Sequence, residues 1–124
     1  AETSAHPIGD EIAGGLPWPV VLFLASVVAP IIEEIFFRGV LYRHLRDATR
    51  ARGTAASILL SAAVSGIVFG AIHPQGLLIA PVLATVAWPL VHAREWRDSL
   101  VAPMAAHAAH NAIILGIALT MLSA

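Results

Sequence analysis

The sequence has no cysteine and no lysine among its 124 residues, and only 12% of its residues are charged. The absence of cysteine excludes disulfides, thiolate nucleophiles and cysteine-based zinc or iron–sulfur sites. Seven arginines stand against eight acidic residues, a balance that argues against a nucleic-acid partner. Soluble domains have about twice this charged fraction, whereas 58% of this chain is hydrophobic and its mean hydropathy is +0.81. We therefore predict a membrane protein.

Charged residues are absent from three long runs, at residues 12–32, 53–93 and 99–124. Each run is long enough for a transmembrane helix of ~20 residues, and the middle run is long enough for two. The runs are rich in alanine and lack the alternation that β-barrel strands require. The fold class predicted is all-α, a polytopic membrane helix bundle of about four transmembrane helices.

The predicted helices cover about residues 18–43, 54–73, 77–92 and 100–122, after a flanking segment at residues 1–17. Pro30 predicts a bend in the first helix, and Pro81 and Pro89 predict interruptions of the third. Residues 39–53 are typical of an amphipathic extension followed by a polar loop, and residues 94–98 of a short charged loop. The chain begins without methionine or a basic region, which disfavours a signal peptide and favours a piece of a longer membrane protein.

Arginine is concentrated in residues 39–53 and 94–98, whereas the N-terminal segment has acidic residues and no arginine. The positive-inside rule places arginine-rich loops in the cytoplasm. We therefore expect an integral, multi-pass protein of the cell membrane, the inner one where there are two, with these loops on the cytoplasmic side.

Three charged residues, Glu33, Glu34 and Arg38, lie inside the first predicted span, ahead of Arg43 at its end. A charged side chain at the bilayer centre costs about 2.5–3.5 kcal/mol, so these residues require an explanation. Glu34 and Arg38 are spaced i, i+4 and can neutralise each other as a structural ion pair. Glu33 points about 100° away from Glu34 around the helix and lacks that partner, which makes it a candidate general base.

Two other predicted helices carry polar side chains at helical spacing. Phe69 and His73 are four residues apart, as are His107 and Asn111, while the role of His110 is left open. Taken alone, His73 is explained by contact with interfacial water, and His107 and Asn111 by hydrogen bonds between helices. Together with the unpaired carboxylate, they supply a base, a partner that orients water and donors for an oxyanion, which amide hydrolysis needs.

These residues form three ordered motifs that closely resemble those of the CPBP family, the CAAX protease and bacteriocin-processing (ABI) intramembrane endopeptidases. The motifs are Glu33-Glu34-x-x-x-Arg38, Phe69-x-x-x-His73 and His107-x-x-x-Asn111. The likeness runs over about residues 28–115, assigns residues 18–124 to the protease core and extends to the type II CAAX prenyl endopeptidases.

The resemblance implies an intramembrane endopeptidase in which Glu33 and His73 activate a water molecule. It implies that His107 and Asn111 stabilise the oxyanion, and that Glu34, Arg38 and Phe69 support the site. The expected partners are the lipid bilayer and a peptide or lipidated protein substrate, with a prenylated CAAX-type tail as one option and the oligomeric state open.

No cofactor is expected, because the sequence has no H-E-x-x-H pair and asparagine is a poor zinc ligand. Zinc bound by Glu33, His73 and His107 is the alternative. Family members usually have helices beyond this core, so a closed cavity is expected to need more than this chain. At ~1.5 Å per residue, Glu33 and His73 fall at different depths, and helix tilt, the Pro30 bend or a membrane-embedded start of the second helix must bring them together.

Two other classes of function fit the same residues. A non-catalytic scaffold or immunity-type relative could use the polar cluster to bind a peptide terminus. A small transporter or proton relay could use the embedded glutamates and histidines, because ionisable groups inside a membrane often mark such pathways.

Overall fold

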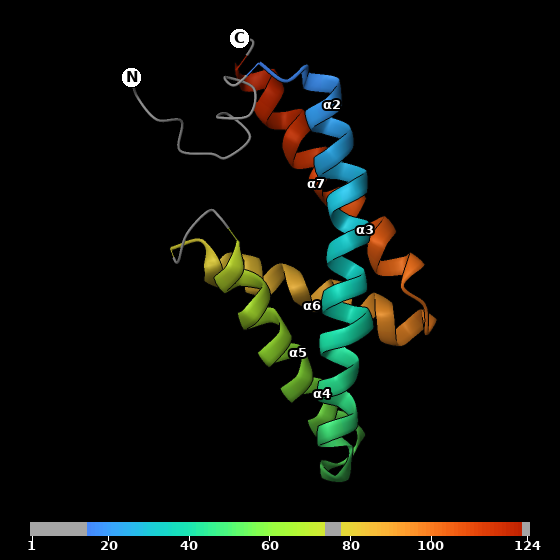
Figure 1. Cartoon of the computed structure of the whole chain (residues 1–124). Coiled ribbons are helices and arrows are strands. Elements are labelled where there is room, and N and C mark those ends of the chain that lie inside the picture. The colour runs from blue at the N-terminus through green and yellow to red at the C-terminus, as the bar shows by residue number, and fades with distance from the viewer. Residues whose placement is uncertain (1–14, 74–77, 123–124) are drawn as a thin grey trace.

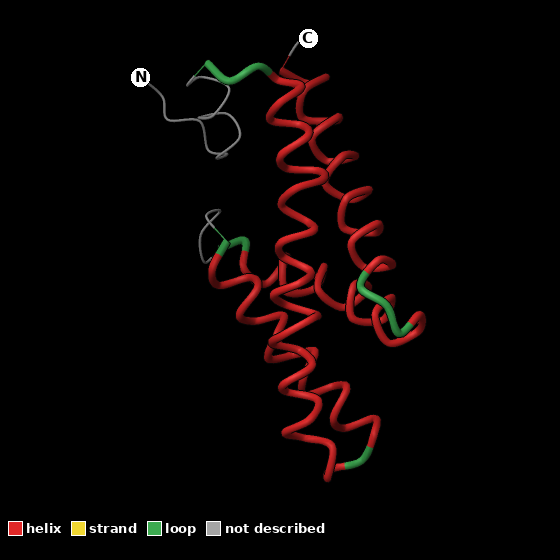
Figure 2. The backbone as a smooth tube through the Cα atoms, turned by 45° about the vertical axis from the view of Figure 1, so that its right-hand side comes forward, coloured by secondary structure: helices red, strands yellow, loops and turns green. Residues whose placement is uncertain are grey.

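The computed structural model describes residues 15–73 and 78–122, and every regular element within these ranges is a helix. The elements are α2 (Trp18–Phe23), η1 (Leu24–Val28), α3 (Ala29–Glu34), η2 (Ile35–Leu41), α4 (Tyr42–Thr49), η3 (Arg50–Arg52), α5 (Thr54–Ile72), α6 (Ala80–Arg97) and α7 (Val101–Leu122). The first six join end to end into one rod, Trp18–Arg52, as the tube in Figure 2 shows. The all-α prediction is confirmed.

Three of the described helices are long and apolar enough to cross a membrane: the rod, α5 and Val101–Met121 of α7. The fourth helix, α6, does not meet this criterion, and it lies across the rod near its middle (Figure 1). Its last two turns contain Arg94, Glu95 and Arg97, which explains its lower hydropathy. The bundle therefore has about four helices, of which three are suited to span the bilayer.

The third predicted helix, at residues 77–92, needs correction at both ends. Residue 77 lies outside the described ranges, and the observed helix begins at Ala80 and continues to Arg97. Pro81 lies in the first turn, where a missing N–H costs nothing, and the helix continues through Pro89. The predicted charged loop is mostly the end of this helix, which stops at Asp98 with a left-handed φ of 45°. The Arg94 guanidinium beside it holds the pKa of that exposed carboxyl below its usual value.

The first predicted helix, at residues 18–43, also proves longer, because it stays helical through Arg52. The polar extension is held by contacts distant in sequence. Tyr42 donates a hydrogen bond to Glu95 at 2.9 Å, and Arg46 donates to the same carboxylate at 3.2 Å and to Ser57. The predicted polar loop shrinks to Gly53, whose φ of 88° suits glycine.

This longer rod removes the conflict in depth between Glu33 and His73. Its 35 residues extend over about 52 Å at ~1.5 Å per residue. Glu33 and His73 are equally far along the chain from Gly53, one before it and one after it. Because α5 runs back along the rod, the two residues reach the same height, with Nε2 of His73 3.8 Å from Oε2 of Glu33.

The other helices pack against different parts of the rod (Figures 1 and 2). α5 packs on its C-terminal half, α7 packs on its N-terminal half, and α6 contacts both α5 and α7. The middle of the rod is therefore the place where all four helices meet. Glu33 and Glu34 lie at this junction, at the end of α3 and next to the π-helical turn η2, a type of turn frequent at functional sites.

The contact between α5 and α6 depends on small residues. Gly66 and Gly70 on α5 face Ala80, Ala84 and Ala87 on α6, the small-residue spacing that lets helices approach closely in membranes. A Cβ atom at Gly66 would lie 3.2 Å from the Ala84 carbonyl oxygen, and one at Gly70 would overlap the carbonyl of Ala80. Close approach here holds α6 beside the end of α5 that carries His73.

Gly70→Ala is accordingly expected to destabilise the fold by about 1–3 kcal/mol, because the overlap is with backbone that cannot turn away. Gly116→Ala in α7 is the matched control, since a Cβ atom there meets nothing within 4 Å. It should be neutral or stabilising by up to ~1 kcal/mol, the helix-propensity gain of alanine over glycine. Unfolding of the full-length protein in detergent measures both, and equal changes would contradict close packing at Gly70.

Candidate active site

Glu34 is fully buried and forms the centre of a charged cluster. Its Oε1 atom accepts a hydrogen bond from Nη1 of Arg38 at 2.9 Å, so the predicted i, i+4 ion pair is present. The same oxygen lies 2.8 Å from Nδ1 of His107 on α7. The sequence did not predict this second contact, because neighbouring glutamates on one helix give no sign of which one faces α7.

Arg38 links the rod to two other helices although it is only 1% exposed. Its Nη2 donates to the carbonyl oxygen of Ala87 on α6 at 3.4 Å. Its guanidinium carbon lies 5.1 Å from the centre of the Phe69 ring and 5.9 Å from that of Phe37, distances at which a cation is attracted to an aromatic face. The cluster is thus neutralised and packed from several sides.

Phe69, buried on α5, is the aromatic centre of the junction. Its ring centre lies 5.0 Å from that of Phe37, 4.2 Å from that of His73 and 5.8 Å from that of His107. It therefore packs against the Arg38 guanidinium and both imidazoles and limits how either ring can turn. This position suits the supporting role predicted for it.

Glu33 points away from Glu34, toward the ends of both imidazoles. Its Oε2 atom lies 3.8 Å from Nε2 of His73 and 3.6 Å from Nε2 of His107. This oxygen is buried and has no hydrogen-bond partner among the described residues, although the side chain as a whole is 28% exposed. Buried polar atoms nearly always have a partner, so this oxygen keeps an unused capacity to accept a hydrogen bond.

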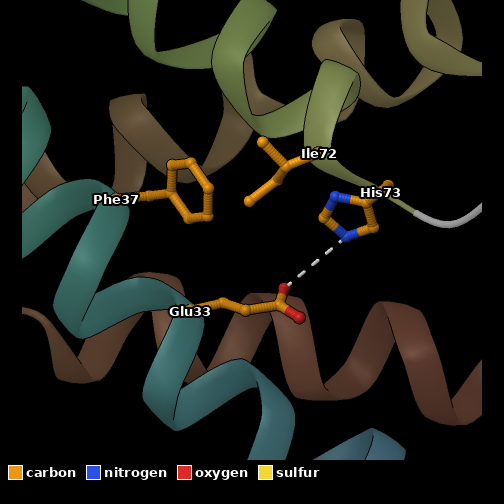
Figure 3. Close-up of a pocket in the computed structure, with 4 residues that line it drawn as sticks. All are labelled: Glu33, Phe37, Ile72 and His73. Atoms are coloured by element: carbon orange, nitrogen blue, oxygen red, sulfur yellow. Dashed lines mark ion pairs between the residues drawn. The ribbon is translucent and has the colours of Figure 1, made fainter. Parts of the chain in front are cut away.

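A pocket of about 130 Å³ opens at this carboxylate and is lined by Glu33, Phe37, Ile72 and His73. Figure 3 shows the Glu33 carboxylate directed at the His73 ring, with the Phe37 and Ile72 side chains beside them. The pocket is thus apolar on one side and carries a carboxylate and an imidazole on the other.

The tautomer of His73 follows from its backbone partner. Nδ1 lies 2.6 Å from the carbonyl oxygen of Phe69, which can only accept, so Nδ1 carries the hydrogen. In the neutral ring, Nε2 then presents a lone pair toward Glu33. His73 follows the last residue of α5, and its side chain thereby bonds back to a carbonyl in the last turn of that helix.

Asn111 is brought to the same face of α7 as His107, but its hydrogen bond leads elsewhere. Its Nδ2 donates to the carbonyl oxygen of Ala25 at 2.8 Å. That carbonyl lacks a backbone donor because the N–H of Ala29 goes to Leu24 in the π-helical turn and Pro30 has no N–H. One hydrogen of the Asn111 amide thus supplies the donor that the rod backbone lacks at Ala25. The oxyanion role of Asn111 stays a prediction.

This arrangement predicts that Asn111 and Pro30 are energetically coupled. Asn111→Ala should cost about 1–3 kcal/mol, because it removes the donor to the Ala25 carbonyl. In a Pro30→Ala background, Asn111→Ala should lower the free energy of unfolding by at least ~0.5 kcal/mol less. Residue 30 then has a backbone N–H that can bond the Ala25 carbonyl in place of the asparagine. Unfolding of the four proteins tests this, with His110→Ala, an exposed change on the same helix, as a near-neutral control. Strict additivity would contradict the coupling.

The alternative of a zinc site can be compared with the same atoms. Glu33, His73 and His107 do gather, but among the described residues no group of three or more His, Cys, Asp or Glu has the geometry of a metal site.

His110, whose role was left open, is exposed on α7.

Comparison with known proteins places these residues in a family. The family model described as type II CAAX prenyl endopeptidase Rce1-like matches residues 15–113. The chain is similar to the membrane-embedded CAAX protease MroQ of Staphylococcus aureus (strain USA300), with 27% identity over 97 residues. That alignment covers 78% of this chain and 38% of MroQ, so the chain spans well under half the length of this relative. No solved structure matches it.

The CPBP resemblance drawn from the three motifs is thereby confirmed, since the matched residues contain all of them. The chain, a helical membrane protein with its buried charges gathered at one junction, belongs to the type II CAAX prenyl endopeptidase Rce1-like family.

Proposed function

We propose that this chain is the catalytic core of a membrane endopeptidase that hydrolyses a peptide bond in a membrane-associated, CAAX-type substrate. The observation that carries the proposal is the position of Glu33, whose unpartnered Oε2 faces Nε2 of both His73 and His107 within 4 Å. Family membership supports a protease, and the geometry supports a division of roles among these three side chains.

Glu33 and His73 are the residues proposed to activate water. An ionised carboxylate and the lone pair of Nε2 are both acceptors, and at 3.8 Å neither can bond the other directly. A water molecule about 2.8 Å from each atom would donate one hydrogen to each and keep its own lone pairs free. Transfer of one proton to Glu33 as the water oxygen attacks the scissile carbonyl is general-base catalysis.

His107 is proposed to stabilise the oxyanion. Oε1 of Glu34, which accepts a hydrogen bond from Arg38, also accepts the hydrogen of Nδ1. Nε2 of His107 then donates a hydrogen bond only when the ring is doubly protonated. The remaining hydrogen of the Asn111 amide is the second proposed donor.

The surroundings strengthen these interactions. Phe37 and Ile72 line the pocket, and Phe69 packs behind both imidazoles. Electrostatic stabilisation of a developing charge is larger where apolar walls exclude water. The proposed reaction uses no metal, and its acid–base steps need only these side chains and water.

Hydrolysis in water enriched in ¹⁸O tests the proposal. The purified full-length protein that contains this core should cleave a quenched CAAX-type peptide, and the new carboxylate should contain one ¹⁸O atom when hydrolysis is direct. Comparing a prenylated peptide with its unprenylated copy shows whether the lipid is required. Binding of the peptide without its cleavage would favour the scaffold. Proton flux in liposomes without peptide cleavage would favour the transporter. Either result would overturn the proposal. Zinc at one equivalent, with activity lost on chelation, would overturn its metal-free mechanism.

A further inference from the structure

A separate polar region lies at the end of the rod distant from the active site, where the chain turns through Gly53. Arg46 is engaged there by Glu95 and Ser57. Two other arginines, Arg50 and Arg52, are exposed and have no ion-pair partner among the described residues, whereas Arg43 lies further back along the rod, within electrostatic range of Asp98. Unpaired positive charge is thus concentrated where two membrane-compatible helices end, on the side that the positive-inside rule predicts to be cytoplasmic.

A groove of about 220 Å³ starts from this charged end and lies between the rod and α5. The rod contributes Leu45, Thr49 and Arg52, and α5 contributes Leu60, Ser61 and Val64. The three rod residues are spaced i, i+4 and i+7, which places them on one helical face.

The two ends of this groove differ in character. Arg52 is next to the turn at Gly53, whereas Leu60 and Val64 lie about two and three helical turns further along α5. Both of these residues are 42% exposed. The hydroxyls between them are already satisfied, because Thr49 bonds the Leu45 carbonyl at 2.7 Å and lies 3.3 Å from Oγ of Ser61. The groove therefore offers one free cation at its mouth and an apolar wall along its length.

We propose that this groove binds one anionic phospholipid, with its phosphate on Arg52 and part of an acyl chain against Leu45, Leu60 and Val64. A guanidinium binds phosphate through two parallel hydrogen bonds, and the neighbouring Arg50 adds positive charge. Basic segments beside a transmembrane helix attract anionic lipid head groups. The volume is below the ~300–1,000 Å³ of an enclosed ligand site, which suits an acyl segment whose remainder stays in the bilayer.

An apolar helix of the longer protein is the competing occupant of this groove. Such a helix would bury Arg52 without a counter-charge, a costly arrangement, whereas a phosphate supplies the missing negative charge. The observations therefore favour the lipid.

Binding of phosphatidylglycerol to the full-length protein in phosphatidylcholine nanodiscs tests the proposal, with lipid retention read by native mass spectrometry. Arg52→Gln should weaken phosphatidylglycerol binding about tenfold or more, the usual effect of losing a charge-assisted hydrogen bond. Arg43→Gln removes the same charge from the same stretch but not from the groove, and it should change binding less than about twofold. Val64→Phe fills the exposed wall and should also weaken retention.

Equal losses for Arg52→Gln and Arg43→Gln would show diffuse attraction to a charged surface and would overturn the site. A wild-type protein without preference for phosphatidylglycerol would do the same. If Val64→Phe instead lowers the unfolding temperature of the lipid-free protein, another segment of the chain fills the groove and the lipid is excluded. None of these outcomes bears on peptide hydrolysis.

Discussion

Glu33→Gln is expected to lower the rate of peptide cleavage by about 10²–10⁴-fold, the usual contribution of a positioned general base. Glutamine keeps the size of the side chain and one oxygen acceptor, but its amide cannot take a proton from water. The protein should still fold, because the Glu33 Oε2 atom has no hydrogen-bond partner among the described residues and the side chain is partly exposed. The variant therefore tests the role of Glu33 in peptide cleavage without an accompanying loss of stability.

The measurement is steady-state cleavage of a quenched peptide by the full-length protein in detergent, with unfolding followed in parallel. Asp47→Asn is the matched control, since it makes the same chemical change at an exposed carboxylate of the rod and should alter cleavage less than about twofold. A Glu33→Gln protein that keeps more than about a tenth of the activity would exclude Glu33 as the base.

Local spacing explains which parts of the site were predictable. Glu34 and Arg38 are four residues apart, as are Phe69 and His73, so helix geometry alone puts each pair on one face. The structure shows both pairs in contact. The contact within each of these two pairs could therefore be predicted from the sequence without knowledge of how the helices pack.

Contacts between helices explain which features of the fold and the site could not be predicted from the sequence. The rod continues through its polar stretch because Glu95 on α6 accepts hydrogen bonds from Tyr42 and Arg46, and a polar stretch by itself is equally typical of a loop. The height of His73 opposite Glu33 depends on that continuation. The different contacts of the two glutamates depend in turn on where α7 crosses the rod, which sets His107 against Glu34 through Nδ1 and against Glu33 through Nε2.

Glu34→Ala is the change expected to damage the protein most. It leaves the guanidinium of Arg38 buried at 1% exposure without its counter-charge, and breaking a buried ion pair in this way costs about 3–5 kcal/mol. It also removes the acceptor that orients His107. Cleavage should therefore be lost together with stability, and the single variant cannot separate the two effects.

A double variant, Glu34→Leu with Arg38→Met, separates them. Replacing both charges by apolar side chains of similar volume removes the uncompensated charge, and such exchanges are neutral or stabilising by about 1–4 kcal/mol. The double variant should be more stable than Glu34→Ala, with a remaining cost of about 1–3 kcal/mol because the buried Nδ1 of His107 loses its acceptor. Cleavage should stay low because Nδ1 of His107 has no carboxylate to hold the ring. A double variant as unstable as Glu34→Ala would mean that shape and not charge governs the cluster. One that cleaves at the wild-type rate would show that Glu34 serves the fold alone, since His107 would then keep its orientation without it.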